Sequence, residues 1–172
     1  FLELRKELVA RGHAFRSHSD SEVIVHLYEE YGADCVRRLS GMFALALFDA
    51  RNNRLLLARD RAGKKPLFYR RLQHGVAFAS EVHALLTGFP GEAPQVDYGA
   101  IDEYLTLQYV PSPRSAYVGI AKLPAAHYAL LTPGGDVRVE RYWSKPGAGA
   151  PAGSARELTD EVARLLERAV GS

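Results

Sequence analysis

Residues 40–81 constrain the fold most, because they form a run of short strands that are apolar on both sides. Side chains alternate between the two faces of a strand, and in 41–49 both sets are apolar. One set is Met42, Ala44, Ala46 and Phe48, and the other is Phe43, Leu45 and Leu47. Since both faces then need cover, the pattern predicts an internal strand. Residues 55–58 have the same character after the turn at 51–53, which predicts an antiparallel hairpin.

Further strands and helices follow from the same kind of pattern. A second hairpin is predicted for 67–70 and 76–79 through a turn at 73–75, and a third for 128–131 and 137–143. Helices are predicted at 1–11, 19–31, 34–39, 81–86, after Asp97 and at 154–170. Ser19 and Glu22 have the spacing of a capping box, in which each side chain binds the other residue's backbone N–H. Helices and antiparallel strands together predict an α+β fold.

The composition excludes several classes of function. The 22 Lys and Arg residues and 20 acidic residues are interspersed, so the net charge of +2 gives no basic stripe for nucleic acid. One cysteine excludes an intrachain disulfide, and no segment has the length and apolarity of a membrane span or signal peptide. We therefore expect a cytoplasmic protein with no nucleic-acid or membrane partner.

Three motifs in order carry a family resemblance. The segments GMFALALFD, LLLARDRAGKKPLFY and FASEVHAL resemble the glutaminase domain of asparagine synthase (glutamine-hydrolysing), a class II glutamine amidotransferase of the N-terminal-nucleophile type. The resemblance covers essentially the whole chain and implies a partial four-layer αββα sandwich. It further implies that 1–93 are the C-terminal part of a glutaminase domain, 94–145 a connecting segment with a helix and a hairpin, 146–154 a flexible linker, and 155–172 the first helix of a synthetase domain.

The resemblance implies one substrate-binding residue in this chain, Asp20. In the family, an aspartate in a Ser-Asp-(Ser/Thr)-Glu context holds the α-ammonium group of glutamine, and that context is matched at 19–22. A carboxylate is suited to this role because it accepts charge-assisted hydrogen bonds. The spacing alone favours a different interpretation, an acid in the first turn of a helix that interacts favourably with the helix dipole, and only the resemblance favours the substrate-binding role.

The resemblance places the family's catalytic residues upstream of Phe1. The nucleophile is an N-terminal cysteine whose α-amine acts as the base, and an Asn-Gly pair supplies the oxyanion hole. We therefore expect a chain truncated at both ends, with no catalytic residue of its own and no activity alone. The parent would hydrolyse glutamine and use the ammonia to amidate a carboxylate, aspartate by the family's example. ATP and Mg²⁺ are expected for the missing synthetase domain, and a homodimer is possible.

The remaining candidates have structural interpretations. The charged loop 59–66 could meet an anionic substrate, but a tight turn with positive φ at Gly63, held by Arg59, Asp60 and Lys65, is favoured. Cys35 is expected to be a buried, inert thiol, and Ser80-Glu81 a helix cap. The histidines at 13, 18, 26, 74, 83 and 127 lack metal-ligand spacing, so no metal site is predicted.

Two alternatives to the glutamine-hydrolysing enzyme remain. One is a degenerate, non-catalytic glutaminase-like module that binds a ligand and docks through the helix of 158–170, whose apolar face needs a partner. The other is a related amidotransferase, such as a sugar-amidating one. The residue at the nucleophile position would separate the enzyme from the module.

Overall fold

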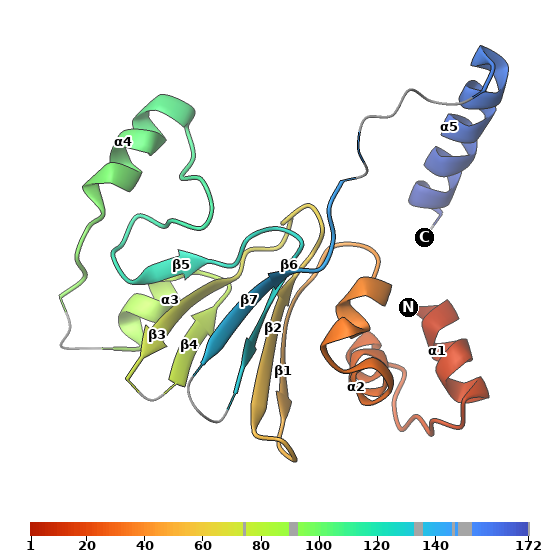
Figure 1. Ribbon diagram of the computed structural model, residues 1–172, viewed down its shortest axis with the longest axis horizontal. Coiled ribbons are helices and arrows are strands. Elements are labelled where there is room, and N and C mark those ends of the chain that lie inside the picture. The colour runs from red at the N-terminus through yellow and green to blue at the C-terminus, as the bar shows by residue number, and fades with distance from the viewer. Residues whose placement is uncertain (74, 90–92, 133–135, 146, 148–152, 172) are drawn as a thin grey trace.

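The computed structural model describes the chain except for residues 74, 90–92, 133–135, 146, 148–152 and 172 (Figure 1). Its helices are α1 (Leu2–Ala10), α2 (Asp20–Tyr31), the 3-10 helix η1 (Gly32–Arg38), α3 (Val82–Thr87), α4 (Tyr98–Leu107) and α5 (Ala155–Val170). Its strands are β1 (Ala44–Asp49), β2 (Arg54–Arg59), β3 (Phe68–Leu72), β4 (Gly75–Ala79), β5 (Ile120–Lys122), β6 (His127–Leu131) and β7 (Val137–Arg141). The α+β class is confirmed. The predicted turn at 73–75 and linker 146–154 lie partly outside the described residues.

The strands form two antiparallel sheets. One has the order β1-β2-β6-β7 and the other the order β4-β3-β5. The three predicted hairpins form as the pairs β1 with β2, β3 with β4, and β6 with β7. Strand β5 was not predicted, because three residues are too few to show an alternation. The expected connecting segment 94–145 thus supplies β5 to one sheet and β6 and β7 to the other.

Two apolar clusters hold these layers together. The first joins the larger sheet to the helices and contains Leu8, Val23, Leu27, Cys35, Val36, Leu39, Leu56, Ala58, Tyr128 and Tyr142. The second lies between the sheets and contains Leu57, Leu67, Leu123, Ala129 and Leu131. Neighbouring residues of β2 point into different clusters, Leu56 toward the helices and Leu57 toward the smaller sheet. The two-sided pattern of 55–58 therefore does mark a strand that is buried on both faces.

Strand β1 differs from its prediction as an internal strand. It lies at the edge of the larger sheet. Leu45 and Leu47 pack against the helices, but Met42 and Phe48 are 65% and 63% exposed. Apolar residues on both faces indicate that a strand needs cover, and they do not say which segment provides it. Within the described residues nothing pairs with the outer edge of β1, so the prediction of an internal strand is wrong.

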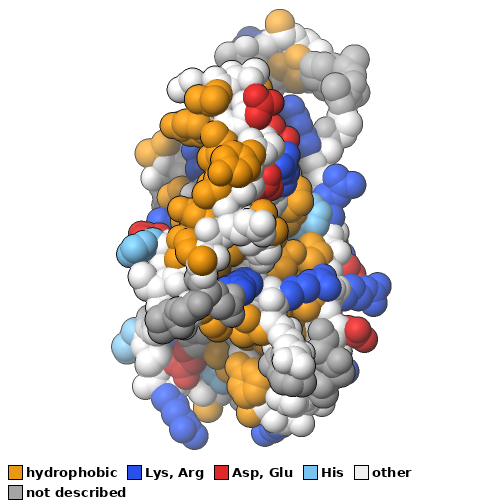
Figure 2. Space-filling view, turned by 90° about the vertical axis from the view of Figure 1, so that its left-hand side faces the viewer, with side chains coloured by type: hydrophobic (Ala, Val, Ile, Leu, Met, Phe, Trp, Pro, Cys, Tyr) orange, Lys and Arg blue, Asp and Glu red, His pale blue; other side chains and the backbone are white. Residues whose placement is uncertain are grey.

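Two helices carry apolar side chains that the rest of the described chain leaves uncovered. In α4 only Ala100 is buried, and no described residue of α5 is buried. Figure 2 shows hydrophobic side chains gathered in the upper half of one face, at the height of α4. The large exposed apolar residues of these helices are Tyr98, Tyr104, Leu105, Leu107, Val162, Leu165, Leu166 and Val170. Among the described helices, none has both the length and the apolarity to cross a bilayer.

Candidate functional site

A groove of about 760 Å³ follows β1 at the edge of the larger sheet. Residues 42–48 form its floor, and the first turns of α2 form one wall. The opposite wall comes from Lys65 and Pro66, which precede β3, and from Ser80, which follows β4. Asp20, the residue singled out from the sequence, lies in the first turn of α2 and lines this groove. Lys65 and Ser80 join it only through the tertiary fold, since neither is near Asp20 in the sequence.

The Asp20 carboxylate is exposed and available to a ligand. Its Oδ1 atom accepts hydrogen bonds from the hydroxyl groups of Ser19 and Ser21. Both hydrogen bonds are long, at 3.4 Å. Among the described residues it makes no ion pair. The positive end of the α2 dipole favours a charged carboxylate at this position. The side chain can therefore accept hydrogen bonds from a cationic group in the groove.

Ser19 and Glu22 do not form the predicted capping box. Ser19 is the N-cap, but its hydroxyl accepts from the backbone N–H of Ser21 at 3.1 Å. The Glu22 carboxylate accepts from the backbone N–H groups of Arg16 and Ser17, each at 2.7 Å, and from the Ser17 hydroxyl. The chain before α2 turns back over the start of the helix. The donors of Arg16 and Ser17 therefore occupy the Glu22 carboxylate, which in a capping box would accept from the N–H of Ser19. Glu22 thereby fixes the turn that leads into Asp20.

The contacts of Glu22 predict a specific dependence of stability on pH. Hydrogen bonds, first from the backbone of Arg16 and then from the Ser17 hydroxyl, lower the pKa of Glu22 to about 2. A carboxyl group whose pKa is depressed by folding stabilises the fold at pH values above its pKa in the unfolded chain, about 4.3. This stabilisation is lost as the pH falls toward 2. Glu22→Gln should therefore lower the midpoint of urea unfolding at pH 6 and flatten its decline between about pH 5 and 2. The exposed Glu3→Gln is the control; parallel curves for wild type and Glu22→Gln would contradict the assignment.

The charged loop 59–66 is held by contacts to backbone groups. Asp60 is 1% exposed, and its carboxylate accepts from the N–H groups of Ala62, Lys64 and Lys65 at 3.0–3.1 Å. Burial raises the pKa of Asp60, but these N–H donors outweigh burial and hold the pKa below its usual value. Arg59 donates to the carbonyl groups of Gly63, Lys65 and Leu123 at 2.6–2.8 Å. The predicted tight turn is present, although backbone groups and not paired charges hold it.

Gly63 predicts a measurable cost of substitution in this loop. Its φ is +65°, as expected, and an added Cβ would lie 3.0 Å from the Cβ of Ala125 and 3.2 Å from the Arg59 guanidinium carbon. Gly63→Ala should lower the free energy of unfolding by about 2 kcal/mol in urea titrations, through both strain and crowding. Gly119, with φ of +79° and open space around it, gives the control Gly119→Ala. An equal loss in the two variants would show that crowding contributes nothing.

The other sequence candidates take no part in the groove chemistry, apart from Ser80 as a lining residue. Cys35 is fully buried, as predicted, and burial raises the pKa of its thiol to about 12. Glu81 is the N-cap of α3, at the predicted position, but no side chain there makes a capping hydrogen bond. The lining of the groove thus includes an acid, a lysine, two serine hydroxyls and an apolar floor. Among the described residues that line it there is no thiol.

Comparisons with known proteins agree with the resemblance carried by the motifs. Residues 1–143 match the family described as glutamine amidotransferase domain. Asparagine synthetase [glutamine-hydrolyzing] 3 of Bacillus subtilis is 39% identical over 143 residues, which are 83% of this chain and 23% of that protein. Asparagine synthetase [glutamine-hydrolyzing] 1 of the same species is 32% identical over 143 residues, 83% of this chain and 22% of that protein. The chain thus spans less than a quarter of the length of these relatives.

A solved structure has a similar fold. Glutamine phosphoribosylpyrophosphate amidotransferase from B. subtilis, complexed with ADP and GMP, aligns with a TM-score of 0.56 at 17% sequence identity. The alignment covers 84% of this chain and 27% of that one. At this level of identity the similarity concerns the fold alone.

Proposed function

The chain belongs to the glutamine amidotransferase domain family, and on this premise we propose that it is part of the glutamine-hydrolysing unit of an asparagine synthetase-like enzyme. The observation that carries the proposal is the position of Asp20, an exposed carboxylate without an ion pair among the described residues, on the wall of the groove along β1. Its role is to accept hydrogen bonds from the α-ammonium group of glutamine. Charge complementarity then orients the substrate, with its carboxamide directed along the groove.

The nucleophile in this proposal comes from a segment that precedes Phe1. Cys35 cannot serve, because it is fully buried with a raised pKa. No described strand pairs with the outer edge of β1, and the exposed apolar side chains of Met42 and Phe48 need cover. A strand added there would complete a four-layer sandwich and bring its residues to the groove lined by Asp20. The 172-residue chain alone should then release no ammonia.

The proposed reaction is acyl transfer. An N-terminal cysteine, deprotonated by its own α-amine, attacks the carboxamide carbon of glutamine; the carbon–nitrogen bond breaks and ammonia leaves with that proton. Water then attacks the thioester, which releases glutamate and regenerates the thiol. The residues of this chain bind and orient the substrate, and the oxyanion donors come from the same preceding segment.

The ammonia would pass to a synthetase domain that follows this chain. We propose that α5 is the first helix of that domain, because its exposed apolar residues, among them Leu165 and Leu166, lie on a helix with no buried residue of its own. The exposed apolar side chains of α4 provide a second contact for the same domain (Figure 2). ATP and Mg²⁺ would bind in the synthetase domain, with aspartate as the carboxylate that is amidated.

Ammonia release from glutamine by the full natural protein tests this proposal. The substrate analogue 4-carbamoylbutanoate lacks the α-ammonium group, so it should be turned over about 100-fold less efficiently than L-glutamine. Asparagine should form when ATP, Mg²⁺ and aspartate are added. A folded protein that releases no ammonia would instead be a non-catalytic binding module, and equal turnover of both substrates would remove the proposed role of Asp20.

A further inference from the structure

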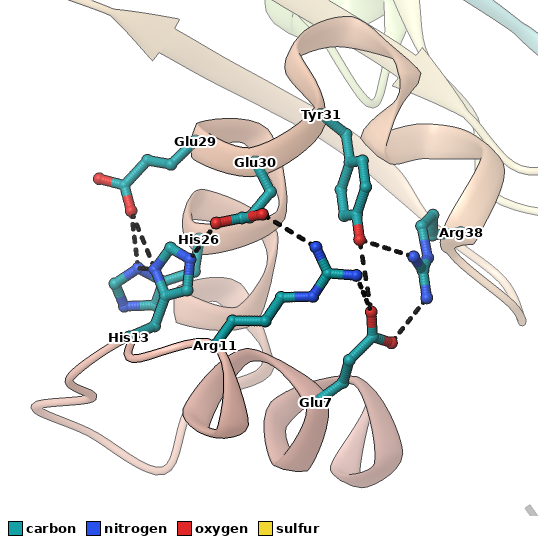
Figure 3. A network of polar contacts seen from close by, with 8 residues as sticks. All are labelled: Glu7, Arg11, His13, His26, Glu29, Glu30, Tyr31 and Arg38. Carbon is teal, nitrogen blue, oxygen red and sulfur yellow. Dashed lines mark hydrogen bonds and ion pairs between the residues drawn. The ribbon is translucent and has the colours of Figure 1, made fainter.

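Two histidines and a glutamate meet beside α2, on residues that do not line the groove (Figure 3). His13 lies in the segment after α1, while His26 and Glu29 lie one turn apart on α2. The sequence predicted no metal site, because the histidines lack ligand spacing along the chain. The fold brings His13 against α2, so that one ligand atom from each residue lies within 4.8 Å of the other two.

The separations of the three atoms match those around a tetrahedral metal ion. The Nδ1 atoms of His13 and His26 are 3.1 Å apart. The Oε2 atom of Glu29 is 2.8 Å from Nδ1 of His26 and 3.5 Å from Nδ1 of His13. In a tetrahedral zinc site with bonds of about 2.0–2.1 Å, neighbouring ligand atoms are about 3.3 Å apart. The measured separations lie on both sides of that value, so an ion needs only small side-chain shifts.

The hydrogen bond on the far side of the His13 ring favours a lone pair on its Nδ1 atom, at the point where the three ligand atoms converge. Nε2 of His13 is 2.9 Å from a Glu30 oxygen, and a carboxylate there holds the single proton of a neutral imidazole on Nε2. In His26, Nδ1 donates to the Glu29 carboxylate at 2.8 Å, and Nε2 makes no hydrogen bond to a described residue. A cation at the convergence point would displace that proton to Nε2, which faces Glu22 at 3.7 Å. With the proton of His26 on Nε2, both Nδ1 lone pairs and the Glu29 carboxylate converge on the cation, which binds all three.

The surroundings hold the ligands in place. The other oxygen of Glu30 is 3.1 Å from the Arg11 guanidinium, which aims Glu30 at His13. The ring of Phe15 packs edge-on against His26 with centroids 4.5 Å apart. The side chains of His13 and His26 are 15% exposed and that of Glu29 is 54% exposed. The cluster is therefore anchored on the protein side and open to water on the other.

We propose that His13 Nδ1, His26 Nδ1 and the Glu29 carboxylate bind a Zn²⁺ ion, with water as the fourth ligand. Two imidazoles and one carboxylate suit zinc better than Ca²⁺ or Mg²⁺, which take all-oxygen sites. The ion cross-links the segment after α1 to helix α2. It thereby supports the helix that begins at Asp20, without any part in glutamine chemistry.

Zinc titration of the full natural protein, stripped of metal and held in excess Mg²⁺, tests the site. Calorimetry should show one more equivalent of bound Zn²⁺ for the wild type than for His13→Gln or His26→Gln. Glu30→Gln, which keeps all three ligands but weakens the support of His13, should weaken binding about 10- to 100-fold. His83→Gln, an exposed histidine on α3, should bind as the wild type does. Co²⁺ at the same site should give visible bands typical of tetrahedral coordination, without the near-ultraviolet band of a thiolate ligand.

Two results would overturn the proposal. One is a wild type that binds no more Zn²⁺ than His26→Gln. The other is full binding by Glu29→Gln, because Glu29 is largely exposed and its replacement leaves the packing of α2 unchanged. Circular dichroism identifies a histidine variant that fails to fold, and the Glu29→Gln titration then decides alone.

Discussion

Replacing Asp20 with asparagine should raise the KM for glutamine by about 100-fold while kcat at saturating glutamine falls far less. The substitution keeps the shape of the side chain and removes its charge, so the hydrogen bonds to the substrate ammonium lose their charge assistance. The ammonium group is remote from the reacting carboxamide, and most of its interaction is therefore the same in the ground state and the transition state. Steady-state ammonia release by the full natural protein measures both constants.

A substrate comparison makes the Asp20 prediction specific. Asp20→Asn should lose the preference for L-glutamine over 4-carbamoylbutanoate, because the analogue has no ammonium group for the carboxylate to recognise. The control is Asp102→Asn, an exposed aspartate on α4 that does not line the groove. If Asp20→Asn retains the full preference for L-glutamine, another group binds the ammonium and the site assignment is wrong.

Removing the Asp60 carboxylate should cost the largest amount of stability, about 3–5 kcal/mol for Asp60→Ala. The side chain is 1% exposed and satisfies three backbone N–H groups, which would lose their acceptor, and its removal would leave a buried cavity. Asp60→Asn should lose less stability, since one oxygen remains to accept from the N–H groups of Ala62 and Lys64. The amide NH₂ group would face the N–H of Lys65, so that two donors meet there. Urea unfolding at pH 7 measures both variants.

A second aspartate provides the control for Asp60. Asp49 also accepts from backbone N–H groups, those of Arg51 and Asn52, but it is only half-buried at a turn. Asp49→Ala should therefore lose much less stability, since water can reach its donors. The lowered pKa of Asp60 means that its contribution is present above about pH 4 and is lost as the pH falls further. Wild type and Asp60→Ala should converge in acid; a constant difference would contradict the charged state of Asp60.

The sequence by itself determined the features that depend on neighbours along the chain. The two-sided apolar run of 55–58 predicted a strand buried on both faces, and Leu56 and Leu57 are 1% and 0% exposed. The hairpins, the Asp97 cap of α4 and the burial of Cys35 followed in the same way. These features could be predicted because strand alternation, helical spacing and caps act over a few residues. The motifs also indicated the family, whose description matches residues 1–143.

Only the tertiary structure decided which distant groups meet. It placed β1 at an edge, brought Lys65 and Ser80 to the groove lined by Asp20, and set the Nδ1 atoms of His13 and His26 3.1 Å apart. The sequence pattern of β1 showed that both faces are apolar but not what covers them. Likewise, the spacing of the histidines concealed a cluster that forms only when the segment after α1 folds onto α2. Strand order and the convergence of side chains depend on long-range packing, which local periodicity does not encode.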